Sequence, residues 1–199
     1  MYKKLAIIGA GGHGKVVGEI ASLNNYKVIN FFDDRNNKIK EFPFSINGSF
    51  SDLKDCLNEY DSFFVAIGEN KARFEMIKLL KNFDLNIVNL VHPSSNISKF
   101  SSMDLGICIM ANAVVNAGTI IKEGVIINTS ASIDHDCIIE DFAHISPNST
   151  LSGGVKIGKF THLGSGTSVH PGITIGDNVK IGIGSKIFKD ISNDSIFKN

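Results

Sequence analysis

The chain has 199 residues, 43% of them hydrophobic, which is enough to build a buried core. Twenty Lys and Arg balance twenty Asp and Glu, so no overall field attracts nucleic acid or an anionic membrane surface. The first apolar run is too short for a signal peptide or a membrane span, and the three cysteines contain no C-x-x-C pair. We therefore expect a cytoplasmic protein that acts on small molecules.

The first ninety residues alternate apolar runs with segments of helical spacing. Residues 5–8 predict a strand and residues 15–23 a helix. Further strands are predicted at residues 28–32, 63–67 and 86–91, and an amphipathic helix over residues 71–83. This order predicts an α/β domain with a small Rossmann-like parallel sheet, which we assign to residues 1–90.

The segment GAGGHG after the first strand matches the pattern G-x-G-x-x-G. That pattern lets backbone approach a pyrophosphate at a helix N-terminus, although a plain tight turn gives the same sequence. Asp33 and Asp34 follow the second strand, where they either contact a ligand or cap a turn. An NAD-dependent enzyme is disfavoured because the domain is short and no dehydrogenase substrate domain follows it.

A six-residue repeat begins near residue 91. Every sixth residue from Ile109 to Ile187 is Ile, Val or Leu. Neither a helix nor a single strand has this period, so residues 91–199 predict a solenoid with stacked inward aliphatics. The small or β-branched residues four places later are also expected to face inward. Glycines directly after the aliphatic residue, at positions 158, 164, 176 and 182, are expected to turn corners with unusual φ and ψ.

The repeat resembles the hexapeptide-repeat family, whose members fold as a left-handed parallel β-helix with three hexads in each coil. A plain structural spacer is the alternative interpretation. A spacer would repeat its outward residues, whereas this chain places unlike groups there, including four histidines at positions 135, 144, 162 and 170. The outward positions therefore favour an enzyme.

Motifs from both halves extend the resemblance to nearly the whole chain. They are GAGGHGKV, FFDD, VAIGEN, HPSS and NTSASIDHDCIIEDFAHISP. Together they resemble the bacterial sialic-acid O-acetyltransferase and bacillosamine or perosamine N-acetyltransferase group. The resemblance implies that the N-terminal domain binds a nucleotide-linked sugar and that the β-helix uses acetyl-CoA. Matching positions place Gly12 and His13 near the diphosphate or sugar, Asp33 and Asp34 near the base, and Gly68 and Asn70 alongside.

The same resemblance implies a coenzyme A channel along the β-helix. Its predicted residues are Asn128, His144, Gly153, Ser165, Gly182 and Lys186, with His144 at the acetyl thioester. A half-buried packing histidine is the alternative for His144. The family usually closes with a G-x-P-A-K loop that helps to hold coenzyme A, and this chain has Ser195 to Asn199 instead, so the adenine end is expected to be held differently.

His135 is the candidate general base. An imidazole titrates near neutral pH, the hexad directs His135 outward, and Asp136 or Asp134 could fix its tautomer through Nδ1. The related acetyltransferases carry their base here beside an acidic residue, usually Glu, so Asp136 is shorter by one methylene. Cys137 falls on an inward position, which disfavours a covalent acyl-enzyme.

His144 lies nine residues after His135, half of a three-hexad coil. The two histidines can therefore meet only across a subunit boundary, and the resemblance implies a homotrimer with active sites between subunits. A zinc hydratase, which uses three histidines on a β-helix, is disfavoured because the histidines lack the close spacing of a shared site, and no metal is expected.

The sequence thus predicts N-acetylation of a nucleotide-linked 4-amino-4,6-dideoxy sugar for surface glycan assembly. O-acetylation of a sialic acid is the second interpretation, and a non-catalytic trimeric sugar-nucleotide scaffold is the third. The sequence leaves open the base, whether uracil, thymine or guanine, and the sugar epimer.

Overall fold

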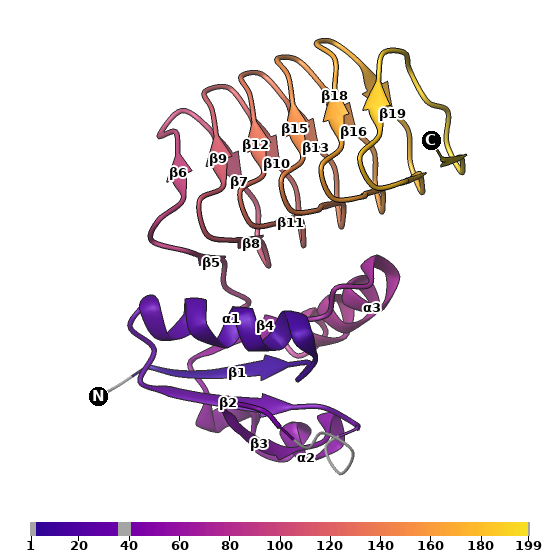
Figure 1. The fold of residues 1–199 in the computed structure, drawn as a ribbon. Helices are drawn as coiled ribbons and strands as arrows, with labels where there is room; N and C mark the ends of the chain where they lie inside the picture. The colour runs from indigo at the N-terminus through magenta and orange to yellow at the C-terminus, as the bar shows by residue number, and fades with distance from the viewer. Residues whose placement is uncertain (1–2, 36–40, 199) are drawn as a thin grey trace. The chain divides into compact units, whose positions relative to one another are not determined.

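The structure, a computed structural model, describes residues 3–35 and 41–198, and the chain divides into two compact units at Leu90 and Val91. No helix in those described ranges is long and apolar enough to cross a membrane. Figure 1 shows an α/β unit built around one sheet and a unit built of stacked coils. Each is described by itself.

The N-terminal unit contains a four-stranded parallel sheet in the order β3-β2-β1-β4. The predicted α/β fold is confirmed. The strands are β1 (Lys4–Ile8), β2 (Val28–Phe32), β3 (Ser45–Gly48) and β4 (Ser62–Val65), and the helices are α1 (Gly12–Leu23), α2 (Phe50–Lys54) and α3 (Asn70–Lys81), with a 3-10 turn at Leu57–Glu59.

The elements differ from the sequence prediction in several places, since most predicted bounds shift by one or two residues and three differences are larger. The helix predicted over residues 15–23 begins at Gly12, inside the glycine-rich segment. β3 and α2 were not predicted, because the strand SING lacks an apolar run and α2 is only five residues long. The strand predicted at residues 86–91 is reduced to a bridge between Ile87 and Phe63 and to β5 (Leu90–Val91).

The second unit is a left-handed β-helix of two-residue strands joined by tight turns (Figure 1). Its strands are β6 (Asn96–Ile97), β7 (Ser102–Met103), β8 (Cys108–Ile109), β9 (Val114–Val115), β10 (Ile120–Ile121), β11 (Ile126–Ile127), β12 (Ser132–Ile133), β13 (Ile138–Ile139), β14 (His144–Ile145), β15 (Thr150–Leu151), β16 (Lys156–Ile157), β17 (His162–Leu163), β18 (Ser168–Val169), β19 (Thr174–Ile175), β20 (Lys180–Ile181), β21 (Lys186–Ile187) and β22 (Ile196–Phe197).

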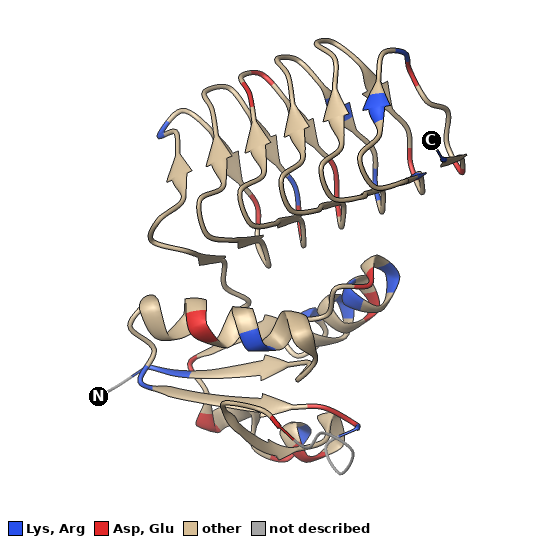
Figure 2. Ribbon diagram, viewed as in Figure 1, with Lys and Arg blue, Asp and Glu red and all other residues tan. Residues whose placement is uncertain are grey.

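Every third strand pairs in parallel, so the coil has three faces. Face 1 contains β5, β8, β11, β14, β17, β20 and β22; face 2 contains β6, β9, β12, β15, β18 and β21; face 3 contains β7, β10, β13, β16 and β19. Paired residues lie one coil apart, as Ile126 and His144 do. Acidic and basic residues are interspersed along the coils (Figure 2).

The six-residue register forms the core of the β-helix, as predicted. The aliphatic residues from Ile109 to Ile187 are buried, and so are most of the small residues four places after them, including Thr119, Cys137 and Ser149. Met103, in the first coil, is exposed at the end of the stack. Stacked aliphatics therefore supply the main apolar burial of this unit.

The prediction for the corner glycines is wrong. The left-handed backbone occurs three residues after each aliphatic from Ile109 to Ile181, for example at Asp136 with φ 59° and at Gly154 with φ 71°. Gly158 and Gly164 have no positive φ, and a Cβ on either would collide with the backbone of the next coil. Close packing between coils, rather than turn geometry, requires glycine there.

Candidate active site

His135 and Asp136 form a hydrogen-bonded pair at the corner between faces 2 and 3. The imidazole Nδ1 lies 2.8 Å from Asp136 Oδ2, and the His135 side chain is 62% exposed. This hydrogen bond, followed by the charge of Asp134, raises the pKa of His135 above its usual value. Because Asp136 accepts from Nδ1, the lone pair of the neutral ring is on Nε2, the atom left for a reacting group.

Asp134 has a different role from Asp136. Its Oδ1 accepts hydrogen bonds from the backbone N–H of His135, at 2.8 Å, and from Asn116 Nδ2, at 3.0 Å. These contacts fix the turn and not the ring. Of the two acids considered from the sequence, Asp136 is the one that contacts the imidazole.

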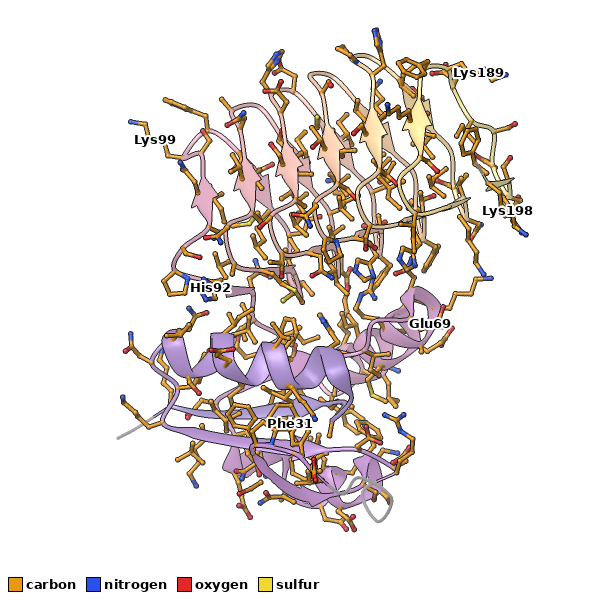
Figure 3. All side chains as sticks on the ribbon, in the orientation of Figure 1. Phe31, Glu69, His92, Lys99, Lys189 and Lys198 are labelled. Carbon is orange, nitrogen blue, oxygen red and sulfur yellow. The ribbon has the colours of Figure 1, made fainter. Side chains whose placement is uncertain are left out.

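The corner column that holds His135 runs along the whole β-helix, from Lys99 to Lys189, and both ends are labelled in Figure 3. The next member after His135 is Gly153. A Cβ on Gly153 would lie 2.6 Å from Nε2 and Cε1 of the imidazole. The His135 ring therefore occupies the space that a side chain at position 153 would need, so glycine is required there.

His144 lies on face 1, away from the His135 corner. It is half-buried and stacks on His162 of the next coil, with ring centroids 4.6 Å apart and planes inclined by 14°. Its Nε2 lies 3.0 Å from Asn128 Nδ2, and His162 Nε2 lies 3.0 Å from Ser146 Oγ. The sequence predicts His162 only as an outward-facing residue. Its stack on His144 joins residues 18 positions apart, one full coil, which the six-residue repeat alone does not reveal.

The other residues predicted for coenzyme A are spread over the β-helix. Ser165 lines a cavity of about 320 Å³. The other lining residues are Ser146, His162, Gly164, Lys180, Ile181 and Ile183. The backbone N–H of Gly182 donates to Phe197, and Lys186 is exposed on face 2. Within one chain, Asn128, His144 and Ser165 gather along face 1 and the corner after it, whereas Gly153 and Lys186 do not.

The N-terminal unit has a cavity of about 510 Å³ where the glycine segment meets the ends of β2 and β4. Its lining residues are Ile8, Gly9, Gly11, Gly12, His13, Phe32, Asp33, Asp34, Arg35, Phe50, Ala66, Ile67, Gly68 and Met76. Five of the six predicted sugar-nucleotide residues lie here. Asn70 does not line the cavity; its Oδ1 accepts from the buried Arg73.

Arg73 does not line the cavity but hydrogen-bonds the backbone of two residues that do. Its Nη1 donates to the carbonyls of Ile67 and Gly68 at 3.0 and 3.1 Å. Burial, with a smaller contribution from the charge of Arg73, lowers the pKa of His13 to about 4. His13 is therefore neutral at pH 7, and its Nε2 is buried without a hydrogen-bond partner among residues 3–35 and 41–198.

The two aspartates after β2 bind protein groups. Asp33 Oδ2 accepts from the backbone N–H of Ala10 at 2.9 Å, and Asp34 Oδ1 accepts from that of Phe50 at 3.0 Å, at the start of α2. Hydrogen bonds from Arg35 lower the pKa of Asp33 to about 2. Sequence reasoning missed Arg35, which has no motif of its own and becomes notable only through these contacts.

Two protein families match the chain. Residues 4–80 match the family described as the PglD N-terminal domain, and residues 154–189 match the bacterial transferase hexapeptide (six repeats). The first match ends inside α3, and the second lies within the coils after the His135 corner.

Solved structures of similar chains cover nearly all of this one. The acetyltransferase domain of PglB from Neisseria gonorrhoeae, in complex with acetyl coenzyme A, is 37% identical with a TM-score of 0.92, covering 98% of this chain and 97% of that one. PerB from Caulobacter crescentus, in complex with CoA and GDP-perosamine, is 31% identical with a TM-score of 0.92, covering 98% and 94%.

A curated relative is the UDP-N-acetylbacillosamine N-acetyltransferase of Bacillus subtilis, which is 34% identical over 113 residues. The match covers 55% of this chain and about half, 52%, of that relative.

Proposed function

Because this chain belongs to the hexapeptide-repeat acetyltransferase group that includes the bacillosamine and perosamine N-acetyltransferases, we propose that it transfers an acetyl group from acetyl-CoA to a nucleotide-linked amino sugar. The 4-amino group of a 4,6-dideoxy sugar is the acceptor that we propose. The observation that carries the proposal is the exposed His135 imidazole, whose Nδ1 is held by Asp136.

In the proposed reaction, His135 acts as the general base. Its Nε2 takes a proton from the sugar amine as the amine attacks the thioester carbonyl. A C–N bond forms, the C–S bond breaks, and the thiolate of CoA leaves and takes the proton from the His135 imidazolium, which restores the base. Asp136 holds the tautomer and stabilises the imidazolium that forms. Transfer is direct, since the buried Cys137 offers no exposed nucleophile.

We assign one of the two candidate binding regions to each substrate. We propose that the N-terminal cavity, with Gly12, His13, Asp34 and Gly68 in its lining, binds the sugar nucleotide. We propose that acetyl-CoA binds along the β-helix, with His144 near the thioester. The His135 corner and face 1 lie on opposite sides of a three-sided coil, so His135 of one chain would act with His144 of another in a homotrimer.

A thiol-release assay tests the proposal. Acetyl-CoA is supplied with UDP-, dTDP- and GDP-linked 4-amino sugars or with a sialic acid. We expect turnover of one amino sugar and a loss of at least about 10²-fold for His135→Ala, the usual effect of removing a general base. His170→Ala, which removes an exposed histidine from the same edge of the β-helix, is the matched control and should keep its activity.

Each contrary result has a distinct meaning. Turnover of the sialic acid alone would replace the N-acetyltransferase with an O-acetyltransferase. Thiol release that persists in His135→Ala would remove the proposed base. No release with any acceptor would leave a nucleotide-binding scaffold as the better interpretation.

A further inference from the structure

The cavity of the N-terminal unit has little positive charge for an anionic ligand. Of the lining residues, all of which lie in the described ranges, Asp33 and Asp34 are acidic and Arg35 is the one cation at pH 7. A bound nucleoside diphosphate brings further negative charge close to these two carboxylates. Its charge must therefore be balanced chiefly by Arg35 and by backbone N–H groups.

Asp33 fixes the Arg35 guanidinium in one orientation. Arg35 Nε and Nη2 donate to the two carboxylate oxygens at 3.0 and 2.9 Å, which is the paired geometry of a bidentate contact. Asp33 is itself held by the backbone N–H groups of Ala10 and Arg35, both at 2.9 Å. With these four contacts, Asp33 has little capacity left to accept from a nucleotide base.

The remaining guanidinium N–H groups are available to a ligand. They have no partner among the described residues, and the Arg35 side chain is 66% exposed although it lines the cavity. Arg35 Nη2 lies 3.8 Å from the position that a Cβ on Gly11 would take. The guanidinium therefore lies beside the glycine segment.

The start of α1 supplies a second set of donors at the same place. Gly11 is the N-cap of this 12-residue helix and provides no side-chain cap. The first backbone N–H groups of α1 are thus open to an anion, and Gly12 and His13 line the cavity. A fixed cation beside open helix N–H groups is the chemistry that binds phosphate oxygens.

We infer that Arg35 is a substrate-binding residue that donates to the diphosphate of the sugar nucleotide, with Asp33 as its positioning residue. The inference rests on the proposed function and changes the role that the sequence predicted for Asp33. It assigns Asp33 to orienting the arginine, in place of direct contact with the base. Base contact then falls to other lining groups, including Asp34, whose Oδ1 accepts from Phe50.

Binding measurements on the full chain test the inference. Calorimetric titrations compare UDP, dTDP and GDP with uridine, thymidine and guanosine, for wild type and for Arg35→Gln. We expect Arg35→Gln to weaken binding of the preferred diphosphate about 10- to 100-fold, the usual value of charge-assisted hydrogen bonds. Binding of the matching nucleoside should change less than about threefold, and Arg35→Lys should recover part of the loss.

Lys15→Gln is the matched control. It removes the same charge from the first turns of α1, but Lys15 is exposed and does not line the cavity. It should leave diphosphate affinity nearly unchanged. Thermal unfolding of each variant establishes that the fold is retained, and a purely structural role for Arg35 would weaken nucleoside and diphosphate alike.

The inference is overturned if Arg35→Gln keeps the diphosphate affinity of wild type, if it weakens nucleoside binding equally, or if wild type binds none of the three diphosphates. Failure of the proposed function looks different. Diphosphate binding that depends on Arg35, without thiol release from acetyl-CoA, would refute the transferase and uphold the phosphate site.

Discussion

His135 illustrates how one neighbouring side chain can set both the orientation and the proton affinity of a base. The carboxylate of Asp136 accepts from Nδ1 at 2.8 Å and raises the pKa of the ring. A raised pKa keeps the imidazole protonated to a higher pH, and only the neutral ring accepts a proton from the substrate. The activity of the enzyme should therefore fall as the pH drops through the pKa of His135.

Replacing Asp136 with Asn should change this pH profile. Without the carboxylate, the pKa of His135 falls, so the acidic limb of kcat/KM moves to lower pH. The plateau should also fall by at least about tenfold, because the tautomer is no longer held. The profile of kcat/KM against pH measures both effects. An acidic limb that stays in place would show that another group titrates. Asp134→Asn is the comparison: it removes a charge that also raises the pKa of His135 but leaves the ring contact intact, so it should move the limb less and keep the plateau.

The stacking of His144 on His162 leads us to predict that His162 affects the KM for acetyl-CoA. His162→Ala removes the ring that lies 4.6 Å from His144, so the His144 imidazole loses its support. Aromatic pairs contribute about 0.5–1.5 kcal/mol, which corresponds to a rise in KM for acetyl-CoA of about two- to tenfold. His162→Phe keeps a flat ring and should keep most of the affinity. Equal effects of Ala and Phe would instead indicate that the imidazole nitrogens of His162 matter.

At the scale of the element, the same tight turn recurs thirteen times between Asn112 and Gly184 with different residues. The third residue after each aliphatic from Ile109 to Ile181 has positive φ, whether it is a glycine, as at position 124, or a larger residue, as at Phe142. The Phe142 ring occupies the space where a Cβ on Gly124 would lie, and it stacks on Phe160 at 5.6 Å. Identical backbone geometry therefore comes with different packing.

Gly124→Ala should destabilise the β-helix more than Gly172→Ala. Both positions have positive φ, so both substitutions carry a left-handed backbone cost of about 1–2 kcal/mol. A Cβ on Gly172 meets nothing within 4 Å, whereas one on Gly124 displaces the Phe142 ring and adds about 1–3 kcal/mol. Urea unfolding of the two variants gives the comparison. Equal losses would show that the aromatic stack moves aside freely.

The repeat made the β-helix predictable, because a six-residue period has few other structural explanations. Ile109 and its successors are buried as their register required. The position of the corners was mispredicted because glycine signals both positive φ and close backbone packing, and only the coil-to-coil contacts separate the two. The contacts of Arg35 and His162 could not be found from local sequence, since their partners lie across a turn or a coil.

At the scale of the whole molecule, the two histidines assigned to one reaction lie on different sides of the β-helix. His135 projects from the corner after β12, and His144 lies on β14, in face 1. A single chain cannot bring both to one thioester without unfolding a coil. The proposed active site therefore needs two chains, each of which contributes one histidine.

Mixing two inactive variants tests this arrangement. His135→Ala and His144→Ala should each lose most activity, but a trimer assembled from both chains contains interfaces at which both histidines are intact. Random assembly of equal amounts, by co-expression, should restore about a quarter of wild-type activity. Co-expression of His135→Ala with Asp136→Asn is the control. It should show no activity above the residual activity of its Asp136→Asn chains, because these two residues act from the same chain. Absence of recovery in the first pair, with trimers present by sedimentation, would place the two histidines in separate roles.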